Sequence, residues 1–162
     1  MTAAIVQWHR QAGLWFAARW YATRAGGQTI GAAEAMARIA DDDVVVLDVR
    51  DRAEYEVSHV PGARNLPLKQ IDQDGWSPDW PTDRPVLTYC TIGYRSGVAA
   101  KQLAERGLDA HNVLGGIVAL AQQGQPFVDA DGPTLRVHTW KRSFAWMLPK
   151  PYETVAYEEN GR

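Results

Sequence analysis

The stretch RPVLTYCTIGYRSGVAAKQLAERG, residues 84–107, decides the fold of this chain. Its first part, RPVLTYC, is a short β-prone run typical of a strand, and VAAKQLAERG carries apolar residues at helical spacing up to Gly107. The glycine-containing TIGYRSG joins the two. A strand, a tight loop and a helix in this order predict one repeating unit of an α/β domain.

The flanking segments continue the alternation of strands and helices. DDDVVVLDV predicts a buried central strand at 44–49, with a short helix before it in AAEAMARIA and another after it in RDRAEYEVS. Downstream, DAHNVLGG and IVALAQQG predict a further strand and helix. This order favours an α/β fold with a mainly parallel sheet covered by helices on both faces. Ligands of such sheets bind beyond the carboxyl ends of the strands, where Cys90 lies.

Composition describes a soluble globular protein. The 162 residues are 46% apolar and 22% charged, with a formal net charge of -2, so nothing indicates a nucleic-acid partner. One cysteine excludes an internal disulfide, and the Asp41–Asp43 run is interpreted as a solvated loop. We expect neither a metal nor another cofactor, because the histidines lack metal-ligand spacing: His9, His59, His111 and His138.

Two extensions flank the α/β segment, which we place at 28–124. Residues 1–27 predict a helix that ends at the paired glycines of RAGGQTIG and lacks the features of a secretory signal or a membrane span. Residues 125–162 form an aromatic, basic extension with turn residues between short β-rich pieces. We expect a cytoplasmic protein. The predicted face of the first helix contains Ile5, Trp8, Ala12, Trp15 and Phe16. The extensions also contain the tryptophans Trp20, Trp140 and Trp146.

Aromatic surface of this extent needs a cover. We expect the two extensions to pack on each other or on a second copy of the chain. Peripheral contact with a membrane surface is the alternative.

The loop after the predicted strand combines the parts that a thiolate nucleophile needs. A lone cysteine at a strand end is commonly a small buried hydrophobic residue. However, Gly93, Arg95, Ser96 and Gly97 suit an exposed anion pocket better than a core. A helix that begins near Tyr94 or Arg95 would point free N–H groups and its positive dipole end at the loop. The arginine adds a planar fork of donors for a sulfonate or phosphate.

Three stretches resemble the rhodanese-like family of single-domain sulfurtransferases. VLDVRDRAEYEVSHVPGARNLPL (46–68) is similar to the first family signature, although Ser58 stands where a glycine usually precedes the histidine. YCTIGYRSGVAAKQLAERG resembles the active-site loop, Cys-x-x-Gly-x-Arg, with its helix, and VLGGI (113–117) resembles the closing signature. The resemblance covers roughly residues 28–124.

The resemblance implies a thiosulfate sulfurtransferase-like (rhodanese) enzyme. Cys90 would take a sulfane sulfur from a small anionic donor such as thiosulfate and pass it, as a persulfide, to cyanide, a thiol or a protein acceptor. Asp48 and Arg50 are interpreted as an ion-paired fold signature, and His59 as a structural turn residue. By position, the donor-binding residues are Thr91, Ile92, Gly93, Tyr94, Arg95 and Ser96.

Two other functions stay open at this point. A cysteine phosphatase or arsenate reductase of the same architecture places five residues between cysteine and arginine, whereas residues 91–94 leave four here. A rhodanese-like sulfur carrier or interaction module would use the same fold without turnover. Such modules frequently lack the cysteine, which this chain keeps together with Arg95.

Overall fold

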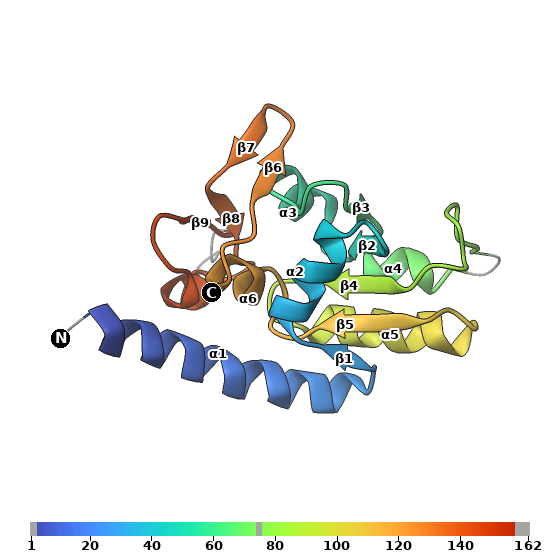
Figure 1. Ribbon diagram of the computed structural model, residues 1–162, viewed down its shortest axis with the longest axis horizontal. Coiled ribbons are helices and arrows are strands. Elements are labelled where there is room, and N and C mark those ends of the chain that lie inside the picture. Colours follow the sequence, from blue (N-terminus) through green and yellow to red (C-terminus); the bar gives the residue numbers. More distant parts are fainter. Residues whose placement is uncertain (1–2, 74–75, 158–162) are drawn as a thin grey trace.

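The structure is a computed structural model, and it describes residues 3–73 and 76–157, with the side chains of residues 3–8 and 10 left out. At its centre is a five-stranded sheet in the order β1-β5-β4-β2-β3, in which neighbouring strands pair in parallel (Figure 1). The predicted mainly parallel sheet is therefore confirmed. The strands are β1 (Thr29–Ile30), β2 (Val45–Asp48), β3 (Arg64–Asn65), β4 (Val86–Tyr89) and β5 (Ala110–Val113).

Helices cover both faces of this sheet, as the sequence predicted. They are α2 (Ala32–Ala40), α3 (Arg52–Val57), α4 (Leu68–Ile71), α5 (Tyr94–Glu105) and α6 (Gly116–Gln122). Alternate residues of β2 and β4 point to opposite faces, so that Val46 and Leu87 join one core with α2 and α6, while Leu47 and Val86 join another with α4 and α5. Both strands are buried along their whole length and are mostly apolar, with Asp48 at the end of β2 and Thr88 within β4 as the polar residues.

The N-terminal extension is a single long helix, α1 (Ala3–Ala25), that lies along one side of the domain (Figure 1). Its buried stripe consists of Leu14, Ala18 and Ala25. The predicted face is wrong in part: Trp15 and Phe16 are 52% and 68% exposed. Small residues form the contact because α1 closely approaches α5. A side chain carbon added to Gly97 would lie 2.5 Å from the Cβ of Ala25.

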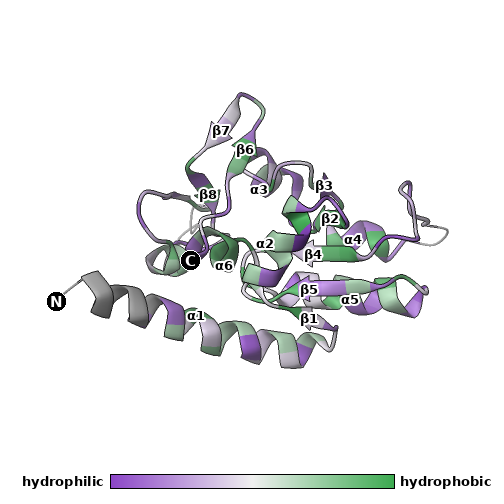
Figure 2. Ribbon diagram, in the orientation of Figure 1, coloured by the Kyte–Doolittle hydropathy of each residue, from purple (hydrophilic) through white to green (hydrophobic). Residues whose placement is uncertain are grey.

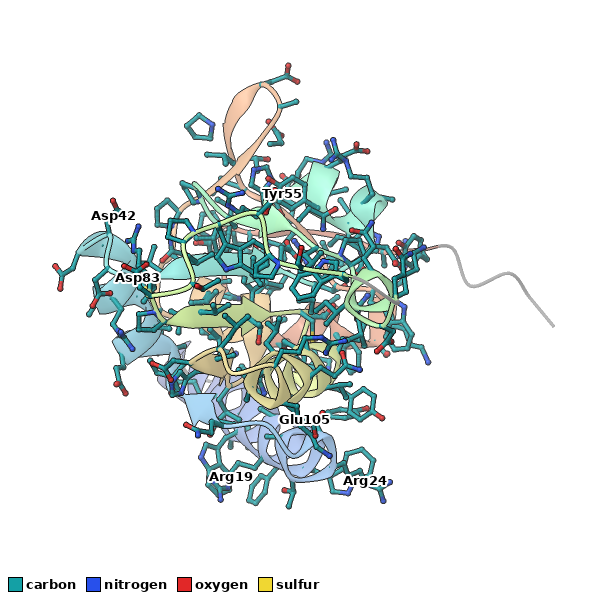
Figure 3. All side chains as sticks on the ribbon, turned by 90° about the vertical axis from the view of Figure 1, so that its right-hand side faces the viewer. Arg19, Arg24, Asp42, Tyr55, Asp83 and Glu105 are labelled. Carbon is teal, nitrogen blue, oxygen red and sulfur yellow. The ribbon has the colours of Figure 1, made fainter. Side chains whose placement is uncertain are left out.

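The predicted face also included Ala12, which is half-buried, and Ile5 and Trp8, whose side chains lie outside the described residues. Hydrophilic and hydrophobic residues alternate along α1 in Figure 2, and Arg19 and Arg24 project from it in Figure 3. Within the described part of the chain, no helix combines the length and apolar character needed to cross a membrane.

The C-terminal extension folds back over the domain. The hairpin of β6 (Phe127–Asp129) and β7 (Gly132–Thr134) bridges to the turn after α3, because His59 and Val128 exchange backbone hydrogen bonds of 2.9 Å. The parallel pair β8 (Arg136–His138) and β9 (Glu153–Val155) encloses a 3-10 helix, η1 (Arg142–Met147). Trp146 of η1 covers Gly13 of α1, so the two extensions contact each other within one chain.

Candidate functional site

Cys90 follows β4 directly and lies at the carboxyl end of the parallel sheet. Its carbonyl oxygen accepts a 2.8 Å hydrogen bond from the N–H of Ile117, at the start of α6. Gly116 makes this close approach feasible, since its φ is 54° and an added side chain carbon would lie 2.3 Å from that carbonyl. The VLGGI segment therefore holds the cysteine loop in place from below.

The loop curls around the sulfur of Cys90. Gly93 precedes α5 with φ of 110°, a conformation that favours glycine, and its N–H donates to Sγ at 3.2 Å. The loop therefore reaches helix α5 at Tyr94, as predicted, with its amino end beside the cysteine. The backbone donor and the helix dipole both favour negative charge on the sulfur.

Ser96 and Asn112 form a buried polar pair beneath the sulfur. The Ser96 hydroxyl lies 3.4 Å from Sγ but only 2.7 Å from Oδ1 of Asn112, so its single proton is directed mainly at the amide oxygen. The amide nitrogen of Asn112 in turn donates to the carbonyl of Gly93 at 3.0 Å. This chain of hydrogen bonds fixes the loop, and it leaves the Gly93 N–H as the firmest donor to the sulfur.

Arg95 is tied to a carboxylate that the sequence analysis did not single out. Its two terminal nitrogens donate to Glu54 at 2.6 and 2.8 Å, and Glu54 is fully buried at the amino end of α3. Burial alone would raise the pKa of Glu54, but the hydrogen bonds and charge of Arg95, with the charge of Arg50, hold it below its usual value. The Arg95 pKa lies above its ordinary value despite burial, because of Glu54 and the nearby sulfur.

A second buried ion pair supports the first. Asp48 and Arg50 are both fully buried and meet at 2.6 Å, which agrees with the predicted fold signature. Arg50 also donates to the carbonyls of Ser58 and His138, at 2.6 and 3.4 Å. His138 itself lies 3.8 Å from Glu54, and desolvation keeps its pKa below the usual value. The C-terminal extension is thus anchored on the same charged cluster as Arg95.

His59 takes part in the local turn and is not among the described residues that line the cavity at Cys90. Its Nδ1 lies 3.0 Å from the carbonyl oxygen of Tyr55, and its ring stacks on that tyrosine with 3.8 Å between centroids. This geometry agrees with the structural role expected from the sequence.

A cavity of about 330 Å³ opens above Cys90. The loop residues predicted to bind the donor divide into two sets here: some line the cavity, while Gly93 and Ser96 lie under the sulfur. Sequence reasoning missed the lining residues supplied by the extensions, although it had noted the aromatic character of both. The lining consists of Tyr21, Cys90, Thr91, Ile92, Tyr94, Arg95, Trp140 and Phe144.

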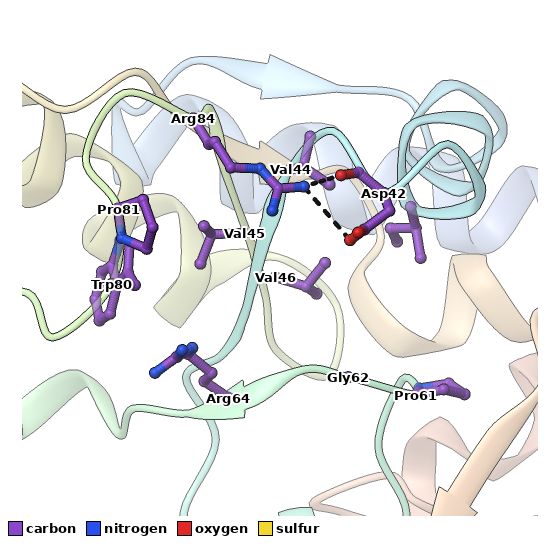
Figure 4. A pocket seen from close by; sticks show the side chains of 11 residues that line it. Asp42, Val44, Val45, Val46, Pro61, Gly62, Arg64, Trp80, Pro81 and Arg84 are labelled. Carbon is purple, nitrogen blue, oxygen red and sulfur yellow. Dashed lines mark hydrogen bonds and ion pairs between the residues drawn. The ribbon is translucent and has the colours of Figure 1, made fainter.

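Another cavity, of about 220 Å³, lies at the amino ends of the strands, away from Cys90 (Figure 4). Its two arginines already have acidic partners: Arg84 contacts Asp42, and Arg64 lies 3.3 Å from Asp79. The predicted solvated loop at Asp41–Asp43 is exposed beside it. Among residues 3–73 and 76–157, no group of three or more His, Cys, Asp and Glu side chains could hold a metal ion.

Comparison with known proteins assigns the family. Residues 31–123 match the model of the rhodanese-like domain, and the chain therefore belongs to the rhodanese-like domain family. A rhodanese-related protein from Thermoplasma volcanium has a similar fold, with a TM-score of 0.57 and 29% sequence identity over 62% of this chain and 97% of that one.

Curated relatives include proteins named as sulfurtransferases. The sulfurtransferase of Allochromatium vinosum is 37% identical over 59% of this chain and 89% of its own length. The thiosulfate sulfurtransferase GlpE of Coxiella burnetii is 32% identical over 51% of this chain and 77% of its own length. The match to the probable adenylyltransferase/sulfurtransferase MoeZ of Mycobacterium tuberculosis, 37% identical over 51% of this chain, spans only 21% of that protein.

Proposed function

We propose that this chain is a sulfurtransferase that moves a sulfane sulfur from a small anionic donor such as thiosulfate to a thiophilic acceptor through a persulfide on Cys90. The observation that carries the proposal is the position of Sγ, which receives the Gly93 N–H at 3.2 Å and lies at the floor of a cavity lined by Arg95. The names of two relatives, a sulfurtransferase and a thiosulfate sulfurtransferase, support the same chemistry.

The first half-reaction needs no cofactor. The Cys90 thiolate attacks the outer sulfur of thiosulfate, a new S–S bond forms, and the S–S bond of the donor breaks with its electron pair leaving on sulfite. The products are a Cys90 persulfide anion and sulfite, so charge and atoms balance. The loop N–H groups stabilise the persulfide as they stabilise the thiolate.

The second half-reaction returns the cysteine. The acceptor attacks the outer sulfur of the persulfide, and the electron pair of the broken S–S bond returns to Sγ of Cys90. Cyanide would yield thiocyanate, and a thiolate would yield a new persulfide.

The Glu54 carboxylate positions Arg95 at the edge of the cavity, where the side chain stays 24% exposed.

Intact-protein mass spectrometry tests this proposal. After incubation with thiosulfate, the protein should gain the mass of one sulfur atom, lose it on addition of cyanide, and release thiocyanate. Cys90→Ser should gain nothing, and Glu56→Gln, an exposed change on α3 that keeps the thiol, serves as the control. An unmodified native chain, or an equally modified Cys90→Ser variant, would overturn the proposal. Turnover of an aryl phosphate would instead favour the phosphatase alternative.

A further inference from the structure

Three of the eight described residues that line the cavity above Cys90 come from outside the family-matched region. Tyr21 comes from α1, and Trp140 and Phe144 come from the C-terminal extension, whereas the family match ends at residue 123. Tyr94, from the loop itself, meets the ring of Tyr21 edge-on, with 5.9 Å between centroids. Four aromatic rings therefore surround the approach to the sulfur, and two extensions of the chain were needed to assemble them.

Tyr21 and Phe144 pack partly against the core, but the other two rings do not fill it. Tyr94 and Trp140 are 45% and 42% exposed, although large apolar side chains are stabilised by burial. A small dianion or cyanide gains little from such a wall, since both need hydrogen-bond donors or positive charge. Exposed aromatic side chains around a concave site are typical of binding surfaces for apolar ligand groups.

The charge of the cavity also tolerates an apolar group beside the sulfur. Among the described residues that line the cavity, Arg95 is the one cationic side chain, and both of its terminal nitrogens donate to Glu54. The wall therefore holds a compensated ion pair instead of a free positive charge. A neutral organic group would replace water there at little electrostatic cost.

The backbone at Trp140 is held in a costly conformation that directs this part of the extension. Its φ is 63°, in the left-handed region that a bulky residue rarely adopts. The Trp140 N–H donates to Nδ1 of His138 at 3.1 Å, and Arg50 donates to the His138 carbonyl at 3.4 Å. Contacts with the charged cluster near Cys90 thus maintain a strained turn whose tryptophan lines the cavity.

From these features we infer that the cavity formed by Tyr21, Tyr94, Trp140 and Phe144 binds the aryl or similarly apolar body of an organic thiol, which is the sulfur acceptor. This inference rests on the proposed function and specifies its acceptor class. The acceptor thiolate attacks the outer sulfur of the Cys90 persulfide, the S–S bond breaks, and its electron pair returns to Sγ. The product is an organic persulfide, and no oxidant or reductant is required.

The test compares two acceptors of similar thiol acidity, benzyl mercaptan and 2-mercaptoethanol. The Cys90 persulfide is loaded with sodium polysulfide, so that the experiment does not depend on thiosulfate, and its discharge is followed by intact mass in a single turnover. Burial of a phenyl group is worth about 1.5–3 kcal/mol, so we expect benzyl mercaptan to react about tenfold faster or more at equal concentration. The ratio of the two rates cancels differences in loading.

Three variants make the measurement specific. Trp140→Ala should reduce the ratio of the benzyl mercaptan rate to the 2-mercaptoethanol rate at least about threefold, as expected when part of that apolar contact is lost. Trp140→Phe, which keeps an aromatic ring, should keep most of the native ratio. Trp15→Ala is the matched control, because Trp15 is 52% exposed on α1 and lies outside this cavity. It should keep the native ratio.

The outcomes separate the two proposals. Equal rates for both thiols, or an unchanged ratio in Trp140→Ala, would overturn the inference about the acceptor even if thiosulfate loads Cys90. Failure of thiosulfate, with polysulfide loading and the predicted ratio intact, would overturn only the proposed donor. A chain that takes up sulfur from neither reagent would contradict both.

Discussion

The buried ion pair between Glu54 and Arg95 allows a quantitative prediction. Glu54→Gln keeps the shape of the side chain but removes its charge, so the two nearby guanidinium groups of Arg95 and Arg50 lose a shared carboxylate. Removing one partner of a buried pair costs about 3–5 kcal/mol. Because Arg95 is 24% exposed and can gain some hydration, we expect about 3 kcal/mol, a large share of the ~5–15 kcal/mol that stabilises a typical domain.

Urea unfolding at pH 7 measures this loss, and α3 offers a matched control. Glu56 lies on the same helix and contacts Arg52 at 2.7 Å, but both side chains are exposed. Glu56→Gln should leave the free energy of unfolding unchanged within error, since solvent screens an exposed pair. The double variant Glu54→Gln/Arg95→Met should recover much of the loss. A loss below about 1 kcal/mol for Glu54→Gln would refute the reasoning about buried charge.

Ser58→Ala should raise the free energy of unfolding by about 1 kcal/mol in urea, because the buried Ser58 hydroxyl has no hydrogen-bond partner among the described residues; a loss would contradict this. Gly116→Ala should lower the free energy of unfolding by more than about 2 kcal/mol and slow persulfide loading, since its new Cβ would meet the cysteine carbonyl. Gly124 has a φ of 83° but open space around it, so Gly124→Ala should lower the free energy of unfolding by only about 1 kcal/mol. Equal losses would be inconsistent with the close approach at Gly116. His138 has a lowered pKa, so the folded state binds its proton less readily than the unfolded chain. The free energy of unfolding should therefore be unaffected by His138 above about pH 6.5 and should fall as the pH drops below that value. In urea unfolding measured from pH 7.5 to 5.5, His138→Asn should flatten this pH dependence. A slope as steep as that of the native chain in this variant would disprove the assignment.

Much of the fold could be predicted because its signals are local. Consecutive residues carry the β-branched run around Val46 and the helical apolar pattern that ends at Gly107. Strand β2 and helix α5 form where these two patterns predicted them. The face of α1 could not be predicted in the same way. Hydrophobicity favoured Trp15 and Phe16, but both are exposed, whereas Ala25 is buried where a Cβ on Gly97 would lie only 2.5 Å from its own Cβ.

The candidate site divides along the same line. Cys90, its glycine and Arg95 lie within six consecutive residues, so their proximity follows from the chain itself, and their assignment to sulfur transfer stays a prediction. Glu54 is 41 residues away from Arg95 in sequence. An acidic residue in a short helix gives no sign of which cation it will meet.

The sequence by itself determined the α/β alternation, the family resemblance and the tight loop from Cys90 to Arg95, because each depends on neighbouring residues. Only the tertiary structure decided that Glu54 compensates Arg95, and that Tyr21 and Trp140, from opposite ends of the chain, share one cavity with the cysteine. The ion pair joins α3 to α5, and the cavity forms where α1 and the C-terminal extension meet around the Cys90 loop, and no local pattern encodes either contact.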